Sequence, residues 1–267
     1  MKLKIQIAIA FLLAFALSLG VVSAAASFVV TSFSCSQADV VINSLFSCSA
    51  TIQNSGDASG TLNTATLYSD SENWLESSNY PQSYGQSVSP GNSITISFSG
   101  LRAVKSGNNG FSKIMLDSVT DNYVVDNNKK VNIIDVAVTL DNSASSAVMG
   151  GEWTATSEVT AGGEVDVSLT FTSNSGGCSI GSQTNPKTLA GMTDGSKQSR
   201  TWTITQGSSG NCRYTISAVA TGVGGTASET DSATSTITCT DCPVESTTTS
   251  SSSGGGGGGG VRDGFGA

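Results

Sequence analysis

The chain has 267 residues, a formal net charge of −8 and only 12% charged residues, and it contains no histidine. The absence of histidine excludes Ser-His-Asp and Cys-His nucleophilic machinery and most catalytic zinc sites. An acidic chain without a cluster of Lys and Arg is also a poor partner for nucleic acid. The sequence shows no catalytic constellation and no cofactor motif, so we predict a protein that is not an enzyme.

Residues 1–26 have the pattern of a secretory signal peptide. Two lysines precede an apolar region over Ile7–Leu19, and Ala24–Ala26 supplies the small residues that a signal peptidase requires. The apolar run to Val22 is close to the lower limit of about 18 residues for a membrane span, so an uncleaved anchor is the alternative. We expect cleavage, a mature chain that begins near Ser27, and a secreted, extracellular or cell-surface location.

After the signal, the sequence predicts β-strands and almost no helix. Short runs of alternating apolar and polar residues are separated by turns rich in Gly, Asn, Asp, Ser and Pro, which is the pattern of a β-sandwich. We therefore predict an all-β protein with two tandem Ig-like β-sandwich domains, over residues 27–135 and 136–242. A disordered Ser/Thr/Gly-rich C-terminal stalk is expected over residues 243–267.

The strands of the first predicted domain follow from this alternation. Leu45–Gln53 alternates strictly, so its apolar residues, beginning with Phe46, are predicted to face the core. A turn at Asn54–Asp57 leads into a second strand at Thr61–Tyr68. Further strands are predicted at Ile94–Phe98, Phe111–Leu116 and Val131–Val136.

The second predicted domain repeats the same order of strands. They are expected at Trp153–Val159, Val165–Phe171, Trp202–Ile204 and Tyr214–Ala218, with a turn at Gly162-Gly163 after the first of them. Equivalent positions lie about 100–107 residues apart, which indicates an internal duplication of one sandwich topology. Convergence is the alternative, because unrelated sandwiches share such patterns.

Short motifs in the first domain resemble a known family. An Asn-x-Gly after a strand lies in Ala50–Gly60, a Pro-Gly-x-Ser turn before Ile-x-Ile-x-Phe lies in Val88–Phe98, and Asp-Asn-Asn lies in Val119–Val136. These segments resemble the cell-adhesion-related Ig-like (CARDB) modules of bacterial and archaeal surface proteins. In the second domain only Arg200–Ile204 and Cys212–Gly222 look similar. The resemblance implies a sandwich fold and a surface role, and it brings no catalytic residues.

All six cysteines follow the signal, and an even number in an exported chain predicts disulfides rather than free thiols. The simplest pair in the first domain is Cys35–Cys48. Three connectivities are open in the second domain. We favour Cys178–Cys212 with Cys239–Cys242, because Cys178 opens a long loop and Cys212 starts the strand after it. A redox dithiol or half a zinc site is the alternative for Cys239-Thr-Asp-Cys242.

Aromatic residues gather in one stretch of the first domain that we expect to be a long irregular loop. Carboxylates at Asp70, Glu72 and Glu76 lie among them. The aromatic residues are Tyr68, Trp74, Tyr80 and Tyr84. Such rings stack on sugars, but the favoured interpretation is a loop that covers the open end of the sandwich with Trp74 and Leu75 as a plug. We expect any ligand recognition to use this loop rather than a sheet face, with cell-envelope glycans or surface proteins as partners.

One group of oxygen-bearing residues is a weak candidate for calcium. No Asp-x-Asp-x-Asp-Gly loop is present, and Asp and Asn are ordinary turn residues, so we predict no metal site. The group consists of Asp121, Asp126, Asn127 and Asn128.

Residues 243–267 have the composition of a flexible linker. A run over Ser246–Ser253 precedes glycines at Gly254–Gly260, and neither segment can bury apolar area. Because only Val261–Ala267 follows, we expect the natural protein to continue into a membrane anchor or a further domain, and a free tail is the alternative.

These features together predict a non-enzymatic extracellular or cell-surface protein for envelope structure, adhesion or partner binding. The alternative is an accessory or spacer module of a larger extracellular enzyme or transporter, whose working domain lies beyond residue 267. Membrane contact is expected only through an uncleaved signal or a missing C-terminal anchor.

Overall fold

The computed structural model describes residues 25–70, 73–117, 123–124 and 130–243. Every regular element within these ranges is a β-strand, which confirms the predicted all-β class. None of the described residues forms a helix long and apolar enough to cross a membrane. Residues 1–24 of the predicted signal, most of the predicted stalk, Glu72 and the calcium candidates Asp121 and Asp126–Asn128 lie outside the described residues.

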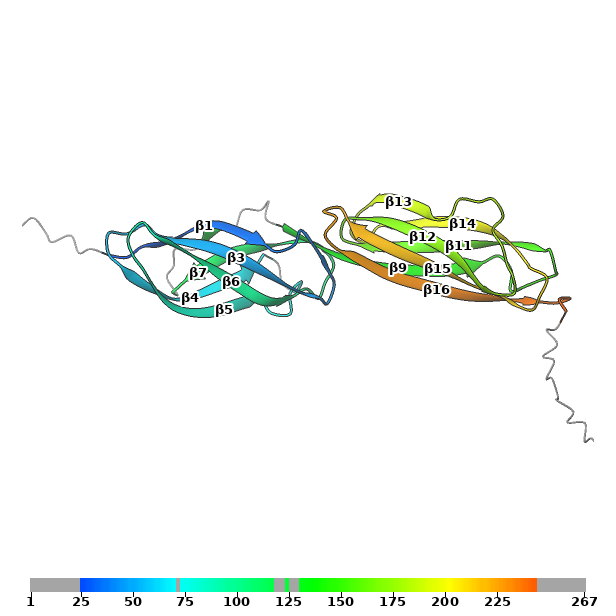
Figure 1. Ribbon diagram of the computed structural model, residues 1–267, viewed down its shortest axis with the longest axis horizontal. Coiled ribbons are helices and arrows are strands. Elements are labelled where there is room, and N and C mark those ends of the chain that lie inside the picture. The colour runs from blue at the N-terminus through cyan, green and yellow to red at the C-terminus, as the bar shows by residue number, and fades with distance from the viewer. Residues whose placement is uncertain (1–24, 71–72, 118–122, 125–129, 244–267) are drawn as a thin grey trace, which may run out of the picture.

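The chain forms two elongated halves that lie end to end, so residue 25 and residue 243 are at opposite ends of the molecule (Figure 1). In the first half, β1, β3 and β6 form one antiparallel sheet. The order β9-β7-β4-β5 forms the other sheet, and β2 pairs in parallel with β9. The strands are β1 (Phe28–Cys35), β2 (Asp39–Val41), β3 (Leu45–Asn54), β4 (Gly60–Ser69), β5 (Asn79–Val88), β6 (Ser93–Arg102), β7 (Gly107–Leu116), β8 (Tyr123–Val124) and β9 (Lys130–Asn142).

The second half has the same strand order as the first. Its sheets are β9-β11-β14 and β10-β16-β15-β12-β13, which correspond strand for strand to β1-β3-β6 and β2-β9-β7-β4-β5. A common order of this kind is what the predicted duplication requires. The strands are β10 (Ser146–Ala147), β11 (Glu152–Gly162), β12 (Val165–Ser175), β13 (Lys187–Met192), β14 (Lys197–Thr205), β15 (Cys212–Gly222) and β16 (Ser228–Cys239).

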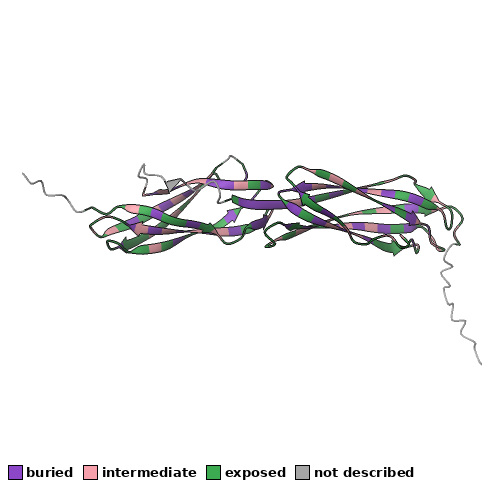
Figure 2. Cartoon of the chain, turned by 90° about the horizontal axis from the view of Figure 1, so that it is seen from above, coloured by how far each residue is buried: buried purple, intermediate pink, exposed green. Residues whose placement is uncertain are grey.

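Each half has its own hydrophobic core between its two sheets. The alternation predicted from the sequence is confirmed, because every second residue of β3 from Phe46 onward is buried and the same holds for β11 from Trp153. Side chains of a strand point alternately to its two faces, so one face packs inward and the other carries exposed residues. Figure 2 shows the buried segments inside both halves and across the region where they meet.

The two halves share strand β9, and no linker separates them. Ile134 is the last residue that pairs with β2, and Asp135 is the first that pairs with β11. Ile133 belongs to the first core and Ile134 to the second. The predicted boundary between residues 135 and 136 therefore falls inside a strand, next to the point where the pairing changes. The strand predicted at Val131–Val136 continues to Asn142, because this segment is rich in β-branched residues and contains neither Gly nor Pro.

Candidate functional site

The aromatic stretch of the first half is a strand pair rather than one long loop, so that prediction is wrong. Tyr68 lies near the end of β4, and the chain returns as β5, in which Tyr80 pairs with Leu67. Tyr84 lies on the same strand. Of the described residues in this stretch, Asp70 and residues 73–78 lie outside the two strands. Tyr80 and Tyr84 of β5 pack against the core and so hold that strand in register.

Trp74 is a core residue, as the favoured plug interpretation predicts, and the alternative in which its ring stacks on sugars is wrong. Its side chain is 0% exposed, and its ring stacks on Phe46 and contacts Phe111 edge-on, with centroid distances of 6.3 and 5.2 Å. Leu75, also buried, pairs with Ala103 in the connection between β6 and β7. The apolar area of Trp74 is therefore used to close this end of the core, as the plug interpretation predicts.

The three tyrosines are half-buried and make contacts within the protein. The ammonium of Lys113 lies 4.6 Å from the ring centroid of Tyr68. The Tyr80 hydroxyl accepts a hydrogen bond from the backbone N–H of Ser77 at 3.2 Å. The Tyr84 hydroxyl donates to the Ser97 carbonyl at 2.9 Å, and burial raises the pKa of Tyr84. With Trp74 buried, the four predicted binding residues do not form one exposed aromatic surface.

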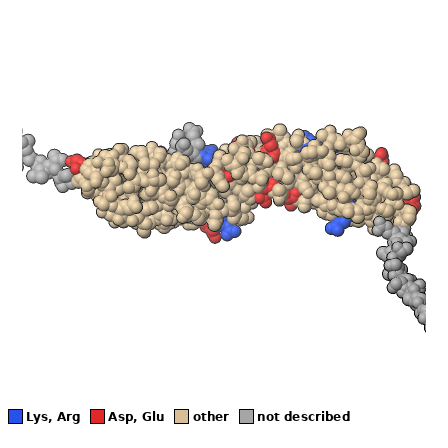
Figure 3. Space-filling model, in the orientation of Figure 1, with Lys and Arg blue, Asp and Glu red and all other residues tan. Residues whose placement is uncertain are grey.

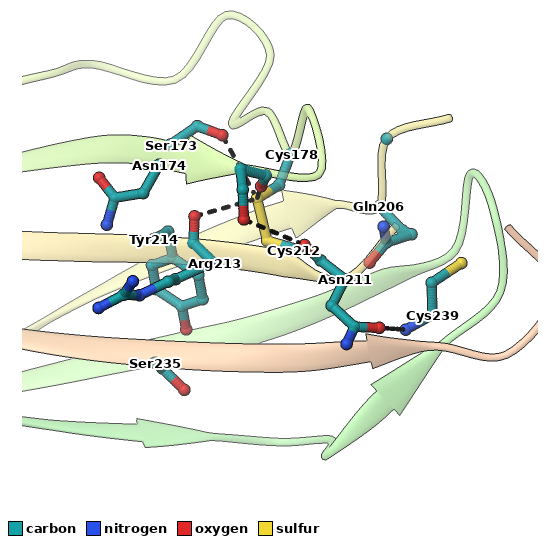
Figure 4. The surroundings of a disulfide bond; sticks show 12 residues. Ser173, Asn174, Cys178, Gln206, Asn211, Cys212, Arg213, Tyr214, Ser235 and Cys239 are labelled. Atoms are coloured by element: carbon teal, nitrogen blue, oxygen red, sulfur yellow. Dashed lines mark hydrogen bonds between the residues drawn. A yellow bond between two sulfur atoms is a disulfide. The ribbon is translucent and has the colours of Figure 1, made fainter. Parts of the chain in front are cut away.

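The cysteines form three disulfides, Cys35–Cys48, Cys178–Cys212 and Cys239–Cys242, which are the pairs favoured from the sequence. Figure 4 shows how Cys178–Cys212 ties the connection after β12 to the start of β15. In the first half the corresponding connection is held by the contact of Trp74 with Phe111 on β7. Each half thus fastens this connection to a strand of the same sheet. The second half uses a covalent bond to β15, and the first half uses packed rings on β7.

The Cys239–Cys242 motif closes the last strand of the second half. The Cys239 N–H donates to the Asn211 side chain at 3.0 Å, and the Thr240 N–H donates to the Ala147 carbonyl at 3.1 Å. Asp241 accepts a hydrogen bond from the Met149 N–H at 2.6 Å. The two sulfur atoms and an Asp241 oxygen lie within 4.8 Å of one another, but the sulfurs are bonded to each other. A metal site or a dithiol here therefore requires prior reduction of this bond.

A polar cluster that was not predicted from the sequence lies where the two halves meet. Asp39 on β2 is 1% exposed, and its carboxylate accepts hydrogen bonds from the second half. These come from the N–H and hydroxyl of Thr226, at 3.1 and 3.2 Å, and from the Gly224 N–H at 3.4 Å. Asn132 donates to the same carboxylate at 2.8 Å and exchanges two hydrogen bonds with the backbone of Glu164.

Glycines of the second half make this close contact possible. A Cβ atom on Gly222 would lie 2.3 Å from the Asp39 carboxyl carbon, and one on Gly163 would lie 2.5 Å from the Ile133 carbonyl oxygen. Gly163 also has φ = 76°, a conformation that side chains other than glycine rarely adopt. The sequence identified Gly162-Gly163 only as a turn, because the residues that it contacts are distant in the chain.

A second set of contacts lies beyond the Asp39 cluster and extends the joint, which is the region where the two halves meet. The Asp194 carboxylate accepts hydrogen bonds from the Ser106 hydroxyl at 3.2 Å and from the Gly163 N–H at 2.9 Å. Asp and Glu side chains are visible near the middle of the molecule, on a face that carries few other charges (Figure 3). The joint is thus held by neutral donors to the buried carboxylate of Asp39 and to the exposed carboxylate of Asp194.

Comparisons with known proteins do not show a family for this chain. No family model and no curated protein match it. Among solved structures, a crystal structure of domains 4 and 5 of the S-layer protein SbsC matches 79% of this chain and 98% of its own length, with 12% identity and a TM-score of 0.25. A likeness at this score carries no conclusion about the role of the present chain.

Proposed function

We propose that the protein is a non-enzymatic extracellular or cell-surface protein that serves in envelope structure, adhesion or partner binding. The observation that carries this proposal is the pairing of all six cysteines in three disulfides. Disulfides form and persist in oxidising compartments, of which the space outside the cell membrane is the commonest. The signal-like residues 1–26 point to the same location.

The proposal includes two tandem Ig-like β-sandwich domains of the CARDB-like type. Its support is the repeated strand order, in which the first strand of each half is divided between the two sheets, as β1 with β2 and as β9 with β10. The short motifs quoted above add the resemblance to cell-adhesion-related modules. In such domains the sheets provide a scaffold, and the loops at the ends provide contacts.

The outer faces of the sheets support a role as scaffold or spacer. Exposed positions of β16 alternate as Ser or Thr from Ser228 to Thr238, and β14 carries Ser199, Thr201 and Thr203 in the same way. Short hydroxyl side chains are well hydrated and present little apolar area to a partner. We propose cell-envelope glycans or surface proteins as partners, bound by loops rather than by these faces.

Export can be tested with the full chain expressed in a bacterial host. We expect the protein in the periplasm or medium, with no free thiol before reduction and six after unfolding and reduction. A control chain that lacks residues 2–22 should remain in the cytoplasm. Retention of the full chain in the cytoplasm with free thiols contradicts the proposal. Binding of the purified protein to cell envelopes, with and without prior removal of glycans, tests the partner.

A further inference from the structure

We propose that the two halves form one tension-bearing rod, in which a pull along the chain loads the parallel strand pairs β2–β9 and β10–β16 in shear. The proposal rests on the surface role above only for the origin of the pull. The resistance itself follows from the strand order, since the described chain enters at one end of the molecule and leaves at the other (Figure 1).

The first half presents a parallel pair to an end-to-end pull. The chain enters by β1 and β2 and leaves by β9, and β2 lies beside β9 in parallel, with Asp39 opposite Asn132. Hydrogen bonds flank this pair, from the Asn132 N–H to the Ala38 carbonyl at 2.9 Å and from the Ile42 N–H to the Ile134 carbonyl at 3.0 Å. A pull moves the two strands in opposite directions along their axes and loads these bonds together, while the Cys35–Cys48 disulfide, which closes a loop around β2, passes part of the load to β3.

The second half also has a parallel strand pair between its entering and leaving segments. The chain enters by β9 and β10 and leaves by β16, and Ser146 and Ala147 pair in parallel with Thr238 and Cys239. The Thr238 N–H donates to the Ser145 carbonyl and the Thr240 N–H to the Ala147 carbonyl, both at 3.1 Å. The Cys239–Cys242 disulfide follows directly and closes the chain at this point.

The pull passes between the halves without a flexible segment. Strand β9 is continuous from Lys130 to Asn142 and is the leaving strand of the first half and the entering strand of the second. The contacts of the buried Asp39 with Gly224 and Thr226 hold the two halves against each other. Burial of the Asp39 carboxylate limits the access of water to its side of these hydrogen bonds.

Single-molecule force spectroscopy on the full chain, held by tags at both ends, tests the proposal. Thr240→Pro removes the N–H that bonds to Ala147 and touches no core residue. We expect it to raise the unfolding rate of the second half at fixed force by about tenfold, the effect of one lost hydrogen bond. Leu189→Ala is the matched control, because Leu189 is fully buried on β13, which pairs only with β12.

The control should lower the melting temperature at least as much as Thr240→Pro and leave the rate under force within about twofold of the natural chain. The reason is that the core around β13 is still intact when β10 and β16 separate. If Leu189→Ala accelerates forced unfolding more than Thr240→Pro does, the parallel pair is not the point of resistance and the proposal is wrong.

A second pulling direction keeps the test independent of any variant's folding. A chemical handle at the exposed Ser208, pulled against the C-terminal tag, separates the antiparallel strands β15 and β16 from one end, one bond at a time. We expect unfolding forces several-fold lower than in the end-to-end direction. Equal forces in the two directions overturn the proposal. Neither result bears on export or surface location, which the cell experiment decides separately.

Discussion

Asp39→Ala tests whether the polar cluster between the halves holds the molecule together. The carboxylate is 1% exposed and accepts hydrogen bonds from Asn132, Gly224 and Thr226. Each hydrogen bond to a charged group is worth about 1.5–3 kcal/mol, and a buried donor left without a partner costs about 1–3 kcal/mol. These terms are not additive, and the donors left behind are neutral, so we take the total at about 3–5 kcal/mol, the worth of about two such hydrogen bonds.

We therefore expect Asp39→Ala to lower the free energy of unfolding by about 3–5 kcal/mol in urea titrations. The corresponding fall in melting temperature is about 6–20 °C for a chain of this size. Hydrogen exchange should accelerate at the amides of Gly224 and Thr226, which donate to Asp39 in the natural protein. Asp39→Asn should recover only a small part of the loss. One carboxylate oxygen is replaced by an NH₂ group, which cannot accept the hydrogen bonds that reach that oxygen in the natural protein.

The matched control is Asp141→Ala, an exposed carboxylate on β9, the strand that pairs with the β2 strand of Asp39. Its effect on the free energy of unfolding should stay within about 0.5 kcal/mol. The reasoning is refuted if Asp39→Ala loses less than about 1 kcal/mol, or if exchange at Gly224 and Thr226 is unchanged while stability falls.

Four further predictions can be checked with purified protein. Gly163→Ala should destabilise far more than Gly85→Ala in thermal melts, because both glycines have positive φ but only a Cβ at position 163 meets neighbouring atoms, whereas open space surrounds position 85. Trp74→Ala should lower the free energy of unfolding by about 3–5 kcal/mol and leave envelope binding unchanged once folded protein is compared; a selective loss of binding contradicts its role as a plug. Burial raises the pKa of Tyr214, so stability should be fully present below pH ~10 and fall at higher pH, and Tyr214→Phe should reduce that fall in alkaline melts. Reduction of Cys178–Cys212, which spans 34 residues, should lengthen the extension released when the second half unfolds under force by about 120 Å, at ~3.5 Å per residue.

The sequence by itself determined the strictly alternating strands and the faces that they bury. Leu45–Gln53 and Trp153–Val159 alternate with a period of two, and that pattern is a property of one strand, independent of its neighbours. The cysteine pairs could also be proposed, since each pair lies within one half and between segments that are close in the chain. The turn at Gly162-Gly163 was visible for the same reason, because turn residues act locally.

The tertiary structure alone decided which strands become neighbours and what the joint contains. No local pattern distinguishes Asp39 from the exposed carboxylates, since its partners Asn132 and Thr226 are 93 and 187 residues away in the chain. The burial of Trp74 likewise depends on rings at positions 46 and 111 that belong to other strands. Alternation reports which side of a strand is apolar, whereas the choice of partner depends on where remote turns meet it, and only the packed molecule brings those turns together.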